Sequence, residues 1–165
     1  MYSDPGFVCG GGEGLKGGLT ALQRFGLRDN QSTWVIVDTG NNMTMAGDDT
    51  LEQYWNAISP EARDAWEVDE SKKMPFTFAL GQQSTSTKLH MIPIFARKLL
   101  RCFSFPGKHP LLLSNCVLDR WNTVLDFPNR TITIGSDPRE PNAQKNRITL
   151  PWQMTDSHHI AMDVS

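Results

Sequence analysis

Residues 34–40 read Trp-Val-Ile-Val-Asp-Thr-Gly, an apolar run that ends on a carboxylate, a hydroxyl and a glycine. β-Branched and aromatic residues fit the pleated surface of a strand, and the polar residues 29–32 before the run are typical of a turn. We therefore expect a buried strand over 33–37 that stops in a tight turn at 38–40. An acid at the end of a buried strand is held in one place, as a catalytic carboxylate must be, although aspartate also caps turns without any chemistry.

The chain that follows shows short strand patterns and a few short helix patterns. The helix patterns cover 48–58 and 59–66, and the second can open with a serine cap and a proline in its first turn. Alternation at 76–80, a turn at 81–84 and a strand pattern at 87–95 predict a hairpin. The remaining expected elements are strands at 99–105 and 110–113, a helix at 117–121, and a hairpin of 124–127 with 131–134. The pattern as a whole predicts an all-β fold with minor helices.

The length of 165 residues suits one domain with flanking segments. Residues 1–28 begin with many glycines and predict a flexible leader, because such a run loses much backbone entropy when it packs. Residues 29–135 hold the expected strands and form the predicted domain. Residues 136–165 are rich in polar and turn-forming residues, and they predict a polar tail outside the core.

Charge and composition argue against several classes of protein. The formal net charge of −2 provides no basic surface for nucleic acid or for an acidic membrane. The first residues lack the charged start and apolar run of a signal peptide, and no stretch reaches the length of a membrane span. The three cysteines fit neither a disulfide framework nor a zinc site. We expect a cytoplasmic protein with reduced thiols.

Other motifs suggest competing functions. Residues 12–17 match the glycine fingerprint of dinucleotide-binding folds, but no run of alternating strands and helices follows, and a glycine linker explains the segment. A nucleophilic cysteine would need a histidine beside it, and the sequence does not place such a pair together. The candidates for that pair are Cys102, Cys116, His90 and His109. His158 and His159 are adjacent but lack a third ligand for a metal. We expect no metal and no organic cofactor.

The Asp-Thr-Gly tripeptide suits one chemistry in particular, the activation of water by two carboxylates that share a proton. One carboxylate takes a proton from the water while the other donates a proton to the carbonyl under attack, and the pair titrates as a unit. The sequence contains the tripeptide once, at 38–40. The second carboxylate would then come from a second copy of the chain, in a homodimer with its site on the twofold axis.

Residues 29–135 resemble the protease domain of retrotransposon polyproteins, within the retropepsin-like family of aspartic proteases. The resemblance rests on residues 34–40, on the apolar pair Leu112-Leu113 followed by a short helix, and on a strand at 124–127 that is similar to the family's Ile-Asp-Phe strand. Further matching segments are 46–54, 76–78, 92–94 and 110–118.

The resemblance implies a small closed β-barrel that is active as a homodimer. It also implies an endopeptidase that cuts a peptide or polyprotein substrate of a retroelement. Asp38 would be the catalytic carboxylate, Thr39 and Gly40 would support it, and the leucine pair would pack beneath the turn. The flap, a hairpin that folds over substrate in this family, would fall at residues 80–84. The implied substrate contacts are Leu80, Gly81, Gln82 and Ser114.

Two positions depart from the family pattern. The glycine that usually follows the apolar pair is Ser114 here, and the polar residue two positions later is Cys116. Glycine is usual at the first position because the backbone is approached closely there. Ser114 therefore favours a second hypothesis, in which the fold has lost turnover and serves as a peptide-binding or dimerisation module.

Overall fold

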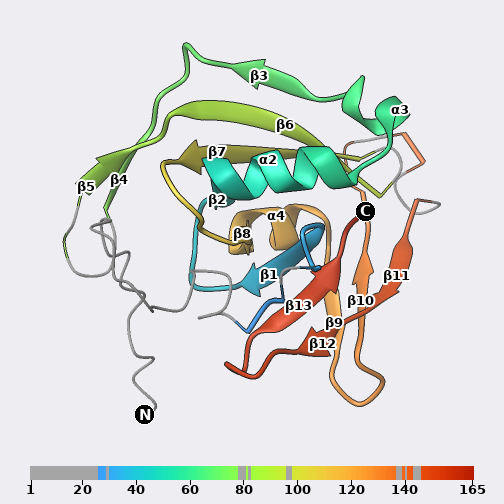
Figure 1. Cartoon of the computed structure of the whole chain (residues 1–165). Coiled ribbons are helices and arrows are strands. Elements are labelled where there is room, and N and C mark those ends of the chain that lie inside the picture. The colour runs from blue at the N-terminus through green and yellow to red at the C-terminus, as the bar shows by residue number, and fades with distance from the viewer. Residues whose placement is uncertain are drawn as a thin grey trace.

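The computed structural model describes residues 26–28, 30–77, 81, 83–95, 98–136, 139, 141–142 and 146–165. Its main element is an eight-stranded sheet with the order β12-β13-β1-β8-β2-β7-β6-β3 (Figure 1). The strands of this sheet are β1 (Trp34–Asp38), β2 (Met45–Gly47), β3 (Glu67–Asp69), β6 (Lys88–Ile94), β7 (Lys98–Phe105), β8 (Leu111–Ser114), β12 (Gln153–Met154) and β13 (Ile160–Asp163).

Two smaller sheets and short helices accompany the main sheet. One small sheet has the order β11-β10-β9 and the other is the pair β4-β5. Their strands are β4 (Pro75–Thr77), β5 (Gln83–Thr85), β9 (Val124–Asp126), β10 (Thr131–Ile134) and β11 (Ile148–Pro151). The helices are α2 (Asp48–Ala57), α3 (Pro60–Arg63) and α4 (Asn115–Arg120). The prediction of a β-rich fold with minor helices is confirmed.

The central strand β1 is buried on both faces, which explains why its apolar residues run without interruption. Val35 and Val37 pack into one core cluster, which also takes side chains from α2, α4 and β10. Ile36 packs into a second cluster on the opposite face, with Leu27 and the partly buried Phe76. Figure 1 shows α2 lying across the main sheet on the side of the first cluster. The carboxyl end of β1 is therefore held from both sides.

The predicted helices and most predicted strands are present with small changes of boundary. In α3 the Ser59 side chain accepts from the Ala62 N–H at 3.2 Å, as expected of a serine cap, but the helix ends at Arg63 and does not reach Trp66. The hairpin near residue 128 is confirmed, because β9 and β10 pair antiparallel. Gly135, just after β10, leaves space for the Trp121 carbonyl, which would lie 2.8 Å from an added Cβ.

The hairpin expected from 76–80 and 87–95 pairs differently. β4 pairs with β5, and Phe76 lies opposite Ser84, inside the stretch that the sequence assigns to the turn. The strand predicted at 87–95 is β6, which pairs with β7 and β3. Period-two alternation identified both strands, but it carries no information about which strand pairs with which.

The prediction that 136–165 forms a polar tail outside the core is wrong. β11 pairs with β10, and β13 pairs antiparallel with β1. Trp152, Met162 and Val164 are buried in the same cluster as Val35. The strand β11 alternates partly buried and exposed residues at period two, and the polar composition of the surrounding segment masked that alternation. At the opposite end of the predicted domain, residues 1–25 of the expected leader lie outside the described residues, and Leu27 is buried.

The expected closed barrel is not observed. Within the described ranges the main sheet is open, because β12 and β3 stand at its two edges without a further partner strand. The described part of the chain also contains no helix that is both long enough and apolar enough to span a lipid bilayer.

Candidate active site

The predicted turn at Asp38 is formed where β1 ends. Asp38 is half-buried, whereas Thr39 and Gly40 are exposed. The Gly40 N–H donates to Oδ1 of Asp38 at 3.0 Å, and the Asn41 N–H donates to the Asp38 carbonyl at 3.3 Å. Among the described residues, Oδ2 of Asp38 receives no hydrogen bond. The backbone thus orients one carboxylate oxygen and leaves the other available to water or a ligand.

Three strand ends meet at this turn. β8 runs parallel to β1, so that Asp38 is the partner of Ser114 and Val37 is the partner of Leu113. On the other side of β8 lies β2, which pairs antiparallel through Met45 and Leu112. Both leucines are buried, but Leu112 packs into the cluster of Ile36 and Leu113 into the cluster of Val37 on the opposite face of the sheet. The loop of residues 39–44 therefore crosses the end of β8 as it leads from β1 to β2.

The loop is fastened to β8 by hydrogen bonds at its middle and at its far end. The Asn115 N–H donates to the Asn41 carbonyl at 2.9 Å. The Ser114 N–H donates to Oγ1 of Thr44 at 3.2 Å, and Oγ1 of Thr44 donates to Oγ of Ser114 at 3.0 Å. Within the loop, Oδ1 of Asn41 accepts from the Met43 N–H at 3.1 Å. The Asp38 turn is thus held both by its own backbone and by β8.

Ser114 fits its position without strain. Its backbone has φ −76° and ψ 158°, an extended conformation that any residue adopts. The side chain is buried, and its hydroxyl is bonded to Thr44. The close backbone approach that led us to expect glycine is therefore filled by a hydroxyl that has a partner. The sequence alone could not identify this partner, because Thr44 lies 70 positions away.

An open depression of about 570 Å³ lies beside the turn. Thr39 borders it from the Asp-Thr-Gly side, and α4 and β9 form its other walls. The remaining lining residues are Asn115, Leu118, Asp119, Asn122, Thr123, Val124 and Leu125. The mixture of apolar side chains with amide, hydroxyl and carboxylate groups suits contact with a peptide.

Of the predicted substrate contacts, Ser114 is adjacent to Asp38, whereas the flap residues are only partly described. Leu80 and Gln82 lie outside the described residues. Gly81 has φ +76°, the left-handed conformation that favours glycine, and nothing lies within 4 Å of a Cβ added there. Its position at the tip of the β4-β5 hairpin is compatible with the predicted turn.

Hydrogen bonds close the base of this hairpin, and a ring contact joins it to β7 of the main sheet. The Met74 N–H donates to Oγ of Ser86 at 2.8 Å, and the Ser86 N–H donates to the Met74 carbonyl at 2.9 Å. Nζ of Lys73 donates to the Thr87 carbonyl. Phe76 also packs against Phe105, with ring centroids 5.7 Å apart. The hairpin therefore leaves the sheet from a fixed point.

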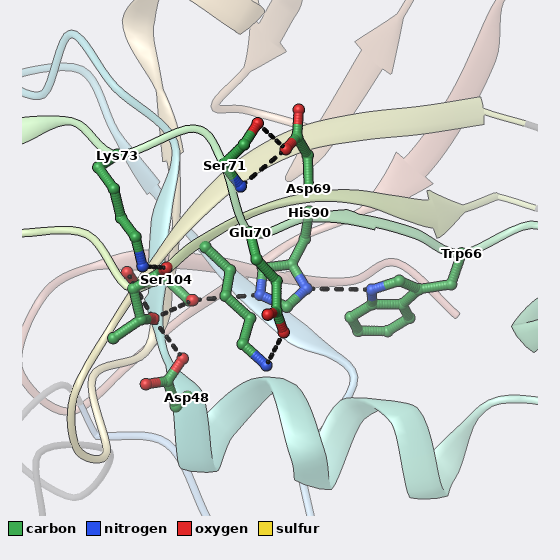
Figure 2. Close-up of polar contacts among 10 residues, drawn as sticks. Asp48, Trp66, Asp69, Glu70, Ser71, Lys73, His90 and Ser104 are labelled. Carbon is green, nitrogen blue, oxygen red and sulfur yellow. Dashed lines mark hydrogen bonds and ion pairs between the residues drawn. The ribbon is translucent and has the colours of Figure 1, made fainter.

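Thr87 belongs to a chain of hydrogen bonds that the sequence did not predict (Figure 2). The Trp66 indole only donates, so Nδ1 of His90 accepts its N–H at 3.1 Å and Nε2 carries the proton. Nε2 contacts Oγ of Ser104 at 3.1 Å, and Oγ of Ser104 contacts Oγ1 of Thr87 at 2.6 Å. Oγ1 of Thr87 donates to the Asp48 carboxylate at 2.8 Å. Each donor has an acceptor only if His90 is neutral.

The environment of His90 favours this neutral form. Burial lowers the pKa of His90 below its ordinary value of 6.5, and Lys88 adds to the decrease, while Asp48 opposes it. Lys88 itself pairs with Glu70 at 3.0 Å on the exposed surface. Protonation at Nδ1 would set two N–H groups of His90 and Trp66 against each other. The network is therefore a structural connection between α2, the hairpin base and β6.

The competing sites are not formed among the described residues. Cys102 and His90 are cross-strand partners, but Cys102 is fully buried and burial raises the pKa of its thiol, so a reactive thiolate is disfavoured. Cys116 is free and exposed. Nδ1 of His159 lies 3.0 Å from the Ser157 hydroxyl, and the described residues contain no cluster of metal ligands. The dinucleotide-like glycines at 12–17 lie outside the described residues.

Asp126 has the structural role expected of a turn residue. Its carboxylate accepts from the Asn129 N–H at 3.0 Å and from Nδ2 of Asn129 at 2.8 Å. These two hydrogen bonds lower the pKa of Asp126. Its oxygens are thus occupied within the β9-β10 turn, unlike Oδ2 of Asp38.

The sequence interpretation missed Thr44, Asn41 and Asn115, which fasten the Asp38 loop. One signal was present, because Thr44 and Ser114 are hydroxyl residues placed where buried strands begin or end. Comparisons of the chain with protein-family models, with curated proteins and with solved structures found no match.

Proposed function

We propose that the chain is an aspartic endopeptidase that acts as a homodimer, with Asp38 of each copy contributing one carboxylate to a shared site. The observation that carries the proposal is the placement of Asp38 at the end of a buried strand, in register with Ser114 on the parallel strand β8. Backbone hydrogen bonds fix one of its oxygens, and the other is available.

In the proposed reaction a water molecule lies between the two carboxylates, which hold one proton between them. The ionised carboxylate removes a proton from the water, whose oxygen forms a bond to the carbonyl carbon of the substrate. The protonated carboxylate donates its proton to the carbonyl oxygen. The amine nitrogen of the tetrahedral diol then takes a proton from the carboxyl group that had accepted one, and the C–N bond breaks. A hydroxyl of the diol returns its proton to the other carboxylate, so that the product is a carboxylic acid and the pair again holds one proton. Metal ions and covalent acyl intermediates have no part in this scheme.

The substrate class follows from the surroundings of Asp38. The depression beside Thr39 has room for side chains of an extended peptide, and the resemblance assigns the flap of the proposed enzyme to the β4-β5 hairpin. Processing of a retroelement polyprotein is the biological role that the resemblance suggests, and it rests on that resemblance alone.

Catalysis is tested by incubating the purified chain with a mixed peptide pool and identifying new termini by mass spectrometry. Asp38→Asn is expected to abolish cleavage, because the amide cannot accept a proton from water. Asp64→Asn is the matched control, since Asp64 is exposed on the surface at the end of α3. In water enriched in the heavy oxygen isotope, one labelled oxygen should enter the new carboxyl terminus. Cleavage that persists in Asp38→Asn would overturn the proposal.

Sharing of the site between two copies is tested by mixing parent and Asp38→Asn chains under conditions of subunit exchange. A mixed dimer holds only one carboxylate and should be inactive. At equal amounts, activity per parent chain should fall to about half, because half of the partners carry the substitution. Activity that stays proportional to the amount of parent chain would show a site built within one copy.

The peptide-binding or dimerisation module is the second candidate. Ser114 was the feature that favoured it, and the unstrained backbone and bonded hydroxyl of Ser114 weaken that argument. The module predicts that a pepstatin-like peptide binds the parent and Asp38→Asn equally while neither cuts the pool.

A further inference from the structure

The residues Thr44 and Ser114, called here the hydroxyl pair, are joined to each other by two hydrogen bonds in the core. Thr44 is 3% exposed and Ser114 is 1% exposed. Oγ1 of Thr44 accepts from the Ser114 N–H at 3.2 Å and donates to Oγ of Ser114 at 3.0 Å. A buried hydroxyl is costly unless it is bonded, so each member of the pair depends on the other.

The hydroxyl pair closes the loop that begins at Asp38. Ser114 is the strand partner of Asp38, and Thr44 is the last residue of the loop before β2. The Thr44 carbonyl also accepts from the Phe103 N–H at 3.0 Å, which ties this end of the loop to β7. Both ends of the loop are thereby anchored to the same end of β8, one by backbone register and the other by the hydroxyls.

We propose that Thr44 and Ser114 are positioning residues, which hold the Asp38 turn in a fixed position relative to the end of β8 through their mutual hydrogen bonds. The serine is then part of the machinery of this chain and not a sign of lost activity. The inference rests on the proposed function for its catalytic consequence. Its structural consequence, the fixed turn, can be measured without any activity.

Reaction rates are sensitive to such positioning, because a displacement of about 1 Å at a catalytic group can cost roughly a hundredfold. Thr44→Val keeps the shape of the side chain and removes the hydroxyl, which leaves both the N–H and the hydroxyl of Ser114 without their partner. Ser114→Gly removes the second hydroxyl and leaves the N–H bond to Thr44. Thr44→Ser retains the hydroxyl and is the conservative rescue.

Thr50→Val is the matched control. Thr50 lies in α2 and is also buried, but its hydroxyl has no hydrogen-bond partner among the residues that the structure describes. The same chemical change there removes no bond. An effect common to Thr44→Val and Thr50→Val would reflect the loss of a buried hydroxyl in general.

The kinetic measurement is kcat and KM for a peptide cut by the parent chain, with each variant checked for folded content. Thr44→Val is expected to lower kcat by roughly tenfold or more with little change in KM, because the group that is displaced acts in the transition state. Thr44→Ser should restore most of kcat, and Thr50→Val should leave it unchanged. The double variant Thr44→Val with Ser114→Gly should be no slower than Thr44→Val alone, since both act through one pair. A parent-like kcat in Thr44→Val overturns the proposal.

The structural measurement is amide hydrogen exchange, which needs no turnover. The Asn41 and Asn115 N–H groups bond within and across the Asp38 loop, so both should exchange faster in Thr44→Val, while the amides of Val35 and Val37 should not change. Unchanged exchange at Asn41 and Asn115 overturns the positioning role, whatever kcat does. If the parent chain cuts no peptide, the proposed function fails by itself, and exchange still decides whether the pair holds the turn.

Discussion

Mild acid is expected to destabilise the protein through His90. The Trp66 indole can only donate, so its hydrogen bond to Nδ1 of His90, at 3.1 Å, requires that this nitrogen carry no proton. A proton on Nδ1 leaves the indole N–H without an acceptor in a partly buried site. The disturbance should pass to Ser104 and Thr87, because the same ring donates to the chain that ends at Asp48.

The direction of the pH effect follows from the pKa of His90 in the two states. Burial lowers this pKa in the folded protein below the ordinary 6.5 that the unfolded chain retains. Between these two values the unfolded state binds more protons, so the free energy of unfolding rises with pH. The stabilisation that depends on neutral His90 is complete above about pH 6.5, and it is lost as the pH falls through the pKa of His90 in the folded protein. A single group limits the slope to about 1.4 kcal/mol per pH unit within that window.

The assay is urea unfolding at fixed protein concentration between about pH 7.5 and 5.5, a range in which histidine is the main titrating side chain. The titration of His109 must be distinguished from that of His90, because burial also lowers the pKa of His109. We expect His90→Gln to flatten the slope, since glutamine keeps a donor and an acceptor but does not titrate. His109→Gln should leave intact the part of the slope that is due to His90. Trp66→Phe should reduce that part, because it removes the donor that disfavours protonation of His90. Equal slopes in parent and His90→Gln would refute the reasoning.

Three further predictions concern packing. Gly47→Ala should lower the free energy of unfolding by roughly 3 kcal/mol or more, because the new Cβ would lie 2.0 Å from the Gly107 carbonyl oxygen; a parent-like urea midpoint would contradict this. Thr50→Val should raise that free energy by about 1 kcal/mol, because the buried hydroxyl of Thr50 has no hydrogen-bond partner within the described part of the chain, and a lower melting temperature would count against this account. Met162→Ala should lower the free energy of unfolding by about 2–5 kcal/mol because Met162 is fully buried, whereas Met154→Ala should change the urea midpoint little because Met154 is exposed. Equal effects would place β13 outside the core.

The sequence predicts those parts of the fold that depend on neighbouring residues. The strand that ends at Asp38 follows from its β-branched run, and the cap of α3 follows from Ser59 and the proline beside it. The β9-β10 hairpin follows from two short strands around a proline-containing turn. In each case the residues that decide the structure lie within a few positions of one another, so the pattern is visible in the chain.

The parts that could not be predicted depend on residues far apart in the sequence. The pairing of β1 with β13 joins Trp34 to Asp163, and nothing in either segment specifies the other. The same holds for Thr44 with Ser114 and for His90 with Trp66, whose polar atoms meet only after the sheet has formed. The strand end and turn at Asp38 could be predicted because their signature is local, whereas the hydrogen bonds that fasten the turn to β8 were missed because their partners lie far apart in the sequence.

The strand that carries Asp38 has neighbours on both sides that are synthesised after it, β8 and β13. While the chain is being made, β1 cannot complete its hydrogen bonds until Asp163 has been added, roughly 6 to 25 s after Asp38 at the usual rate of about 5–20 residues per second. During that interval an apolar strand with unpaired backbone groups is open to association with other chains. Recruitment of chaperones to this nascent chain should therefore peak before β13 is made. The Asp38 carboxylate should reach its final position only in the last stage of folding.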